Sequence, residues 1–391
     1  MKSNKTTTAI AIMTLFFMSM GIGAVTPALA DIAKAFPNIP FTTIALVTTL
    51  PSLFIIPATI VSGALLGTKV SYRMMTLMSM VLFTVFGIAP YFFRDFTAIL
   101  VARAGFGIAM GLASPIANAL IFKLIDGPKV PGMMGLGTVI MNVGGIVMQM
   151  VAGILCAINW ALTFFVFLFG ALAFFIVLIW LPEPPKEEQM QGGEKVKMPL
   201  GVYGLSAVFG LLMMLMYPLL LNMSTIIVDG NLGNAAAAGA VLSLWTVGGM
   251  AAGAVFGTIV KILKKLVIPV SLVVAVLGLI VVIYAKTLLI LTVGAVIIGI
   301  AFSLVMPAFM MDVGAMVPPA ATAKAISAVM VAINVGGFIS TFYIGALIQV
   351  TGNTDVRFHI TISMVCYFVI AVLLGVYKLK GPAKTVPPPA A

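Results

Sequence analysis

The chain carries the same short motifs twice, at an almost constant spacing. An Asn-Val-Gly-Gly motif begins at Asn142 and again at Asn334, and a Gly-Ile-Ala motif begins at Gly107 and again at Gly299, so both pairs lie 192 residues apart. Chance matches would not share one spacing along a chain of 391 residues. The sequence therefore consists of two homologous halves, and its fold must repeat about its midpoint.

Composition places both halves in a membrane. Hydrophobic residues make up 62% of the chain and charged residues only 8%, whereas soluble proteins are about half apolar and about a quarter charged. Cys156 and Cys366 lie far apart in apolar segments, and His359 is the single histidine. Neither a disulfide framework nor a metal site is predicted. We expect no cofactor and no enzymatic activity.

Twelve apolar runs of about 20 residues are long enough to cross the ~30 Å hydrocarbon core of a bilayer. A duplicated membrane chain of this kind is typical of transporters whose site lies between the repeats. We therefore predict an all-α membrane protein with two six-helix halves. The predicted spans are 8–30, 41–66, 74–93, 97–124, 131–157, 161–181, 201–227, 237–262, 267–285, 288–311, 321–349 and 357–379. The predicted parts are a first half (1–182), a cytoplasmic linker (183–200), a second half (201–380) and a disordered tail (381–391).

Lysine and arginine residues predict the orientation, because they gather in cytoplasmic loops. With the N-terminus inside, sixteen of the 21 basic residues fall on the cytoplasmic side, four fall outside, and Arg103 lies within a span. We expect a multi-pass protein of the plasma (inner) membrane with both termini in the cytoplasm. The net charge of +11 is then a topology signal that suits anionic membrane lipids. We expect lipid contacts and no nucleic-acid partner.

Two segments resemble signatures of the major facilitator superfamily. The loop after the second span of that family reads Gly-x-x-x-Asp-Arg-x-Gly-Arg-Arg. Here Gly63 and Arg73 stand at its ends, while Gly67 occupies the acidic position. The fourth span of the family carries Arg-x-x-Gln-Gly, which Arg103 matches, while Phe106 replaces the glutamine. The resemblance covers nearly the whole chain and implies alternating access by two rocking halves.

The resemblance also bears on gating and coupling. In the family, the loop acid helps to lock the gate, so Gly67 implies that this gate is latched differently. Gly63, Gly67 and Arg73 are gate candidates, as are Gly253 and Gly257 at the 190-residue repeat of the two glycines. The drug:proton antiporters of the family have a first-span Gly-to-Pro spacing that is present here, but their fifth-span Gly-Pro is missing.

Arg103 is the one charge well inside a predicted span, roughly 9 Å below its outer end at 1.5 Å per residue. Ionisable groups there usually face a cavity or a partner. We interpret Arg103 as a ligand for an anionic substrate or as a cation that tunes a proton site. The alternative is a side chain that snorkels to the outer headgroups.

The ten acidic residues avoid the middle of every predicted span. Asp31 follows Pro27 at the outer end of the first span, and Asp312 ends the tenth span on the inner side. Because a buried carboxylate can load and release a proton, Asp31 and Asp312 are coupling candidates together with Arg103. The alternative for both acids is a solvated position at a helix end.

Several polar residues within spans are candidates for contact with substrate. Asn142 and Asn334 occupy equivalent positions in the two halves; they either line a central cavity or make hydrogen bonds between helices packed closely at the adjacent glycines. Unlike most other Trp and Tyr residues, Tyr217 and Trp245 lie away from span ends. The further candidates are Asn118, Gln149 and Asn222.

Pro27 and Pro218 fall in the first span of each half. Proline interrupts the helical hydrogen-bond ladder, and broken helices expose backbone groups where a transporter needs a site. We therefore predict hinges at both prolines, with a plain packing kink as the alternative.

We conclude from the sequence that the chain is a secondary transporter, with no nucleotide-binding motif. It moves a small organic solute by alternating access, with protons as the expected coupling ion, and we expect a monomer. The alternative is uptake or exchange of an organic anion held by Arg103. A broad multidrug exporter or a lipid transporter is a more distant possibility.

Overall fold

The computed structural model describes residues 5–67, 69–93, 95–125, 129–184, 198–318 and 321–380. Within these ranges the chain is helical apart from turns and one isolated bridge between Leu66 and Val70. Twelve described helices are long and apolar enough to cross a membrane, as predicted. The predicted tail and residues 185–197 of the predicted linker lie outside the described residues.

Short breaks divide several spans of the first half into two or more helices. In chain order its elements are α1 (Lys5–Met18), η1 (Gly21–Gly23), η2 (Thr26–Ala28), α2 (Leu29–Ala35), α3 (Phe41–Ile44), α4 (Leu46–Leu65), α5 (Tyr72–Phe92), α6 (Phe96–Ala113), α7 (Ile116–Leu124), α8 (Val130–Ile158), η4 (Trp160–Leu168) and α9 (Phe169–Trp180).

The second half is built from longer continuous helices. Its elements are α10 (Leu200–Val228), α11 (Ala235–Ala254), α12 (Phe256–Leu263), η5 (Lys264–Leu266), α13 (Val267–Ile283), α14 (Leu288–Gly314), α15 (Thr322–Thr351) and α16 (Val356–Lys380).

Polar residues in the loops fix where spans begin. The side chains of Ser71, Asp95, Asn234 and Thr287 each accept a hydrogen bond from a backbone N–H in the first turn of α5, α6, α11 and α14. These bonds satisfy donors that a helix start otherwise leaves free. In each of these spans, a polar residue therefore caps the helix at the position where the apolar run begins.

The two prolines predicted as hinges have different effects. Span one is broken: α1 stops at Met18, and Pro27 lies in the 3-10 turn η2 before α2 begins. By contrast, α10 continues as one helix through Pro218. The predicted break at Pro218 is therefore wrong at the level of the helix, since only the hydrogen bond that proline cannot donate is lost.

Span eight is also shorter than predicted. The sequence predicts it over 237–262, but α11 ends at Ala254 and a separate short helix, α12, follows. A hydropathy profile does not detect this break, because the apolar pattern continues through it.

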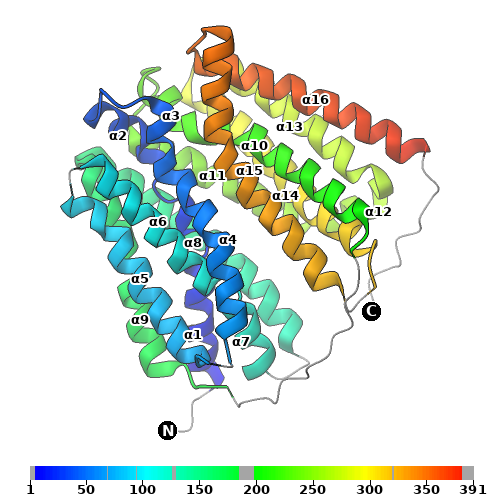
Figure 1. Cartoon of the computed structure of the whole chain (residues 1–391). Coiled ribbons are helices and arrows are strands. Elements are labelled where there is room, and N and C mark those ends of the chain that lie inside the picture. Colours follow the sequence, from blue (N-terminus) through cyan, green and yellow to red (C-terminus); the bar gives the residue numbers. More distant parts are fainter. Residues whose placement is uncertain are drawn as a thin grey trace.

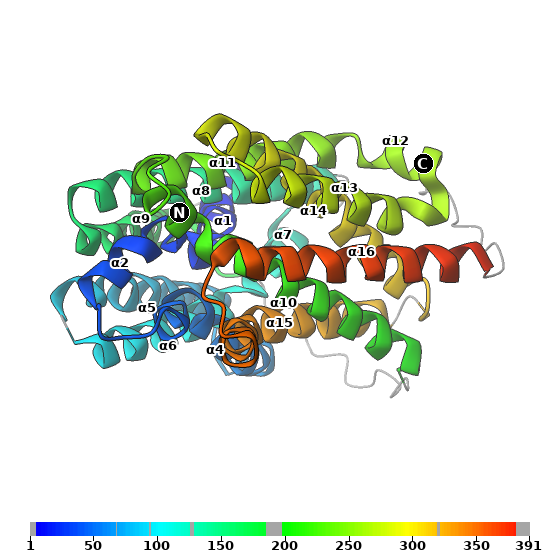
Figure 2. The same ribbon diagram turned by 90° about the horizontal axis from the view of Figure 1, so that it is seen from above.

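Each half has its own hydrophobic core. One core is formed by buried residues between Ala11 and Leu181, joined by three residues of the second half, and the other by buried residues between Val202 and Ala371. Figures 1 and 2 show the first half (blue to green) beside the second half (green to red), with α11 next to α8 and α15 next to α4.

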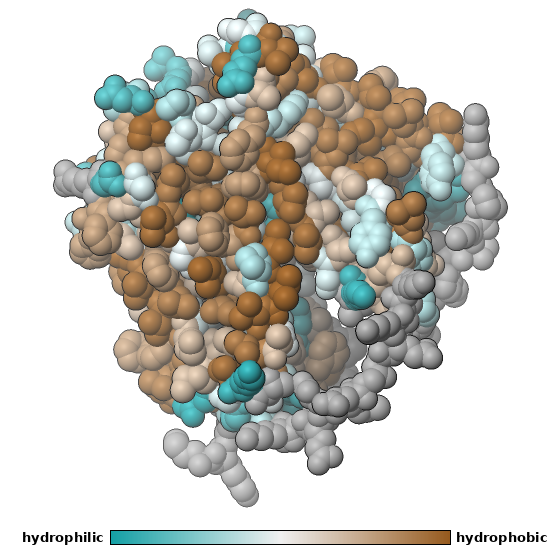
Figure 3. Space-filling model, in the orientation of Figure 1, coloured by the Kyte–Doolittle hydropathy of each residue, from teal (hydrophilic) through white to brown (hydrophobic). Residues whose placement is uncertain are grey.

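The outer surface suits a lipid environment. Many large apolar side chains are exposed on it, such as Ile60, Ile179 and Leu373. The face in Figure 3 is largely brown (hydrophobic), with teal polar groups gathered near its two ends. A soluble protein would not expose a patch of this extent.

Contacts between the halves gather at one end of the molecule. We call the end at which α1 and α15 begin the terminal end, and the opposite end, at which α2 and α15 finish, the distal end (Figure 1). Near the distal end, Ser224 Oγ donates to the Pro27 carbonyl at 2.5 Å. Toward the same end, Lys34 Nζ lies 3.1 Å from Asp229 Oδ1.

Glycines near the terminal end face open space. A Cβ atom added to Gly63, Gly132, Gly135 or Gly204 would meet no atom within 4 Å. These glycines lie on α4, α8 and α10, which are the helices that approach the other half closer to the distal end. The described contacts therefore hold the two halves together at the distal end.

Candidate functional site

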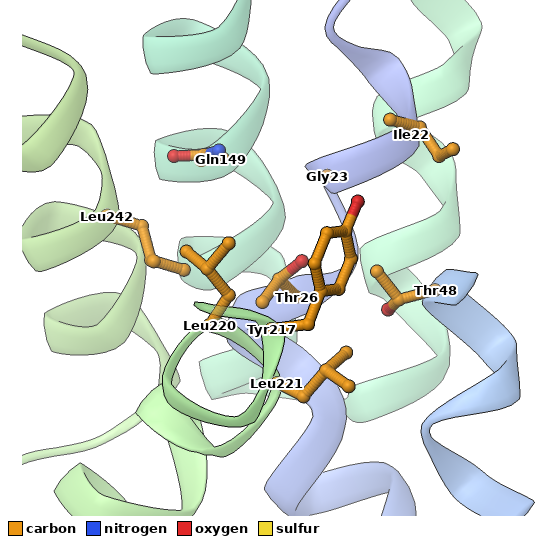
Figure 4. Close-up of a pocket in the computed structure, with 9 residues that line it drawn as sticks. All are labelled: Ile22, Gly23, Thr26, Thr48, Gln149, Tyr217, Leu220, Leu221 and Leu242. Atoms are coloured by element: carbon orange, nitrogen blue, oxygen red, sulfur yellow. The ribbon is translucent and has the colours of Figure 1, made fainter. Parts of the chain in front are cut away.

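A small cavity lies between the two halves. It has a volume of about 110 Å³, and residues of both halves line it, from span one, α4, α8, α10 and α11 (Figure 4). The lining residues are Ile22, Gly23, Thr26, Thr48, Gln149, Tyr217, Leu220, Leu221 and Leu242. The broken span one supplies three of them, because the chain between α1 and α2 brings both backbone and side chains to the cavity wall.

Two polar atoms of this wall lack a hydrogen-bond partner within the described part of the chain. They are Thr48 Oγ1, on a residue only 6% exposed, and Gln149 Oε1. An unsatisfied buried acceptor or hydroxyl costs about 1–3 kcal/mol. Such atoms are therefore ready to bind a solute or water that enters the cavity.

Among the described residues of the cavity wall none is charged. Its polar groups are two hydroxyls of threonine, one amide and the phenol of Tyr217, and the remainder is aliphatic apart from Gly23. Of the residues predicted to contact substrate, Gln149 and Tyr217 are in the wall. Ile22, Thr26 and Thr48 were missed, because a threonine or isoleucine in an apolar run gives no signal of a cavity.

Arg103 is completely buried in the core of the first half rather than in the cavity wall. Its guanidinium carbon lies 4.4 Å from the centroid of the Phe106 ring and 5.5 Å from that of Phe167. The snorkelling alternative is therefore wrong, because aromatic rings surround the group where headgroups were expected. Such rings attract a cation.

One hydrogen bond of Arg103 has a specific reason. Its Nε donates to the Val47 carbonyl of α4 at 2.6 Å. Four residues later in α4 is Pro51, which has no N–H to donate to that carbonyl. Arg103 thus satisfies a backbone acceptor that proline leaves free. Its Nη1 and Nη2 have no partner among the described residues.

Asn142 and Asn334 have the same local conformation. Each Nδ2 donates to the carbonyl four residues earlier, Thr138 in α8 and Met330 in α15, at 3.0 and 2.9 Å. Both residues are partly exposed and neither lines the cavity. The structure therefore keeps the symmetry of the pair without bringing the two residues to one site.

The glycines after these asparagines explain the repeated motif. A Cβ on Gly144 would lie 2.0 Å from the Phe17 carbonyl oxygen, and one on Gly336 would lie 2.1 Å from that of Gly210. Each motif therefore lets the fifth span of a half touch the backbone of the first span of that half. Close approach through small residues is a common way for membrane helices to pack.

Three other candidates lie away from the cavity wall. Asn222 is buried and its Nδ2 donates to the Pro218 carbonyl at 2.8 Å. Trp245 is partly buried in the second half, with its ring centroid 6.3 Å from that of Phe302. Asn118 on α7 is exposed.

The coupling candidates differ in their surroundings. Asp31 is partly buried on α2, and its Oδ2 accepts a hydrogen bond from the Cys156 thiol at 3.5 Å. Asp312 forms an ion pair with Lys378 of α16. This ion pair ties α14 to α16.

The predicted gate loop is bound to the chain that follows α9, a contact that the sequence did not reveal. The carboxylate of Glu183 accepts two bonds of 2.8 Å from the backbone N–H groups of Tyr72 and Arg73, at the start of α5. Arg73 also donates to the Leu178 carbonyl. This acid, the first residue of the predicted linker, occupies the helix N-terminus, where a negative charge is favoured.

The glycines of the predicted gate loops differ in backbone conformation and in the atoms around them. Gly67 has a φ of +75°, a conformation that glycine adopts without strain. A Cβ on Gly253 would lie 3.2 Å from Ser303 Oγ, while one on Gly257 would meet nothing within 4 Å.

Within the described ranges, no three His, Cys, Asp or Glu side chains lie close enough to hold a metal ion.

The comparisons with known proteins agree with this architecture. The family model described as the Major Facilitator Superfamily matches residues 11–341. No curated protein sequence matches the chain. The chain therefore belongs to the major facilitator superfamily, and it is a membrane transporter of the secondary type with two pseudo-symmetric six-helix halves.

Solved transporter structures share the fold at low sequence identity. A bacterial homologue of the human lysosomal transporter Spinster, inward-facing and occupied, is 16% identical, with 98% of each chain covered and a TM-score of 0.76. A mutant of the nucleoside transporter NupG is 13% identical, with 94% of this chain and 99% of that chain covered and a TM-score of 0.79. The human organic anion transporter MFSD10 is 13% identical, with 95% and 100% covered and a TM-score of 0.64.

Proposed function

We propose that this transporter moves a small, uncharged or amphipathic organic solute through the cavity between its halves. The observation that carries the proposal is the composition of the cavity wall. Both halves contribute to it, and Thr48 and Gln149 offer polar atoms without partners on an otherwise apolar surface. Sites for small molecules commonly combine an apolar lining with a few polar groups that orient the ligand.

Alternating access would give the cavity its two openings. The described contacts between halves lie toward the distal end, and the lysine pattern supports a cytoplasmic position for the terminal end. The molecule then corresponds to a state closed toward the outside of the plasma membrane. Rocking the halves would break the distal contacts and open the cavity to the other side. We propose that a monomer suffices, because both halves of the site belong to one chain.

Coupling to protons is the energy source that we propose. Asp31 supports it best, because this carboxylate is partly buried and lies one turn from Lys34, whose ion pair with Asp229 joins the halves. Protonation of Asp31 would change the charge beside that ion pair. Arg103 would keep a positive charge in the first half during the cycle.

The second candidate function is transport of an organic anion. It is favoured by the two unpartnered nitrogens of Arg103, which form the strongest hydrogen bonds with carboxylates. It also requires Arg103 to leave its aromatic surroundings and reach the cavity, since it does not line the cavity in this state. We therefore rank it below an uncharged or amphipathic solute.

A ligand screen by thermal shift tests the proposal. Purified protein is heated with neutral polar solutes, amphipathic cations and organic anions, at two pH values, because a ligand of the folded state raises the midpoint. The expected hit is a neutral or amphipathic compound whose effect is lost in Thr48→Val and Gln149→Ala. Thr292→Val is the matched control, because Thr292 lies on α14 and bonds to its own helix.

Two outcomes would change the conclusion. If both cavity variants keep the ligand effect, the site lies elsewhere. If organic anions alone stabilise the protein, the second function is favoured; that effect should then disappear in Arg103→Met/Pro51→Ala, where the second substitution supplies the backbone N–H that the Val47 carbonyl needs. Uptake into proteoliposomes that is unaffected by collapse of the proton gradient would rule out proton coupling.

A further inference from the structure

The two halves differ at α12. Gly67 of the first half lies in a turn closed by the Leu66–Val70 bridge. Its counterpart Gly257, 190 residues later, lies inside α12 (Phe256–Leu263). The segment that forms a loop in the first half therefore forms a helix in the second half. We call α12 together with η5 the basic segment (Phe256–Leu266).

The basic segment is amphipathic and lies on the surface. It has no fully buried residue. Phe256, Val260 and Leu263 pack against the core of the second half, as expected for residues spaced by three and four positions along one helix face. Ile262 is 71% exposed, so an apolar side chain also faces outward.

Three cations accompany this exposed apolar surface. Lys261, Lys264 and Lys265 are exposed, and no described carboxylate forms an ion pair with them. The sequence holds no acidic residue between Asp229 and Asp312. Both of these acids are already paired, Asp229 with Lys34 and Asp312 with Lys378.

Two details indicate that the charge is held in place. Lys265 Nζ donates to the Leu379 carbonyl at 3.4 Å, which ties the segment to the end of α16. Lys264 has a φ of +49°, a backbone conformation that favours glycine and costs other residues energy. A lysine therefore occupies a position where glycine would be less strained.

We propose that the basic segment binds the phosphate headgroup of an anionic phospholipid in the leaflet at the terminal end. An amphipathic helix with lysines on its polar side lies naturally in the interface plane, and each lysine near an anionic leaflet adds attraction. The membrane is the occupant, because Ile262 needs an apolar medium beside the same lysines. Since α12 directly follows α11, and Leu242 of α11 lines the cavity, a bound lipid would fix the terminal end of a cavity helix.

Lipid retention in nanodiscs tests this site without any transport assay. Protein is placed in phosphatidylcholine nanodiscs with rising phosphatidylglycerol, and retained lipid is counted by native mass spectrometry alongside thermal unfolding. The variant Lys261→Gln/Lys264→Gly/Lys265→Gln should bind phosphatidylglycerol about tenfold more weakly or worse and lose its stabilisation by that lipid. Lys264→Gly relieves backbone strain, so it should not impair folding.

The control removes equal charge from the same end of the molecule. Lys5→Gln/Lys69→Gln/Lys129→Gln should retain phosphatidylglycerol, and Lys261→Arg/Lys265→Arg should behave as the wild type. Equal loss in the control would show a diffuse surface-charge effect and overturn the proposal, as would full retention in the basic-segment variant. Neither result depends on the identity of the solute, so the proposed function stands or falls separately.

Discussion

Arg103 Nε donates a hydrogen bond of 2.6 Å to the Val47 carbonyl, the acceptor that Pro51 leaves without its helical partner. The bond joins α6 to α4 inside the core of the first half. A free carbonyl is costly within a membrane, because no water reaches it. The guanidinium therefore has a structural role in this state, separate from any role during transport.

This relationship predicts a rescue. Arg103→Met should lower the free energy of unfolding by about 1–3 kcal/mol, because the Val47 carbonyl then has no donor. Adding Pro51→Ala should recover most of that loss, since residue 51 regains an N–H. Thermal unfolding of both single variants and the double variant measures the coupling. Equal stability of Arg103→Met and wild type would show that the bond contributes nothing.

The glycines of the repeated motif predict a second result. Gly144→Ala and Gly336→Ala should each destabilise the protein by about 1–3 kcal/mol, because a methyl group would collide with backbone oxygens that cannot move aside. Gly132→Ala and Gly204→Ala are the matched controls, since nothing lies within 4 Å of their added Cβ. Melting midpoints in one detergent check the difference, and a uniform loss in all four variants would contradict it.

Much of the fold could be predicted from the sequence. Hydropathy locates twelve spans because a bilayer demands long apolar helices, and the constant spacing of Asn142 and Asn334 reveals the duplication. The break near Pro27 was also correctly predicted. The continuous helix through Pro218 was not, because neighbouring packing decides whether a helix bends or breaks at a proline.

The site was harder to predict, for a physical reason. Polarity marks Gln149 and Tyr217 in an apolar run, but Thr48 and Ile22 become cavity residues only through the packing of the two halves. Charge marked Arg103, which in this state lies in the core of the first half rather than in the cavity wall, where rings and a carbonyl offset its cost of burial. Sequence shows which groups are costly in a membrane, while the packing decides which of them face a cavity.

Thr49 and Thr341 predict a third result. Their hydroxyls lie 2.8 Å apart across the two halves, and both residues are buried. Thr49→Val should cost about 1–3 kcal/mol, because the Thr341 hydroxyl is left unsatisfied. The double variant with Thr341→Val should be close to wild type, since no polar group remains unpaired. Thermal unfolding tests this cycle; a double variant as unstable as the sum of its parts would argue against the pairing.

Lys34 and Asp229 predict a result for gating rather than for stability. Their side chains are 56% and 54% exposed, so the pair contributes at most about 1 kcal/mol and its loss should leave the melting midpoint nearly unchanged. Lys34→Asp places two like charges at the distal contact and should shift the conformational equilibrium toward the open distal end by about fivefold, which is about 1 kcal/mol.

The swapped variant Lys34→Asp/Asp229→Lys restores opposite charges and should return the distances between the halves to those of wild type. Spin labels on α2 and α10 measure these distances by pulsed electron paramagnetic resonance. The shift should shrink in high salt, because exposed charges are screened. If the swap leaves the distal end as open as the single variant does, the two residues do not act as a latch, and this end is closed instead by buried contacts such as those of Ser224 with the Pro27 region and of Thr49 with Thr341.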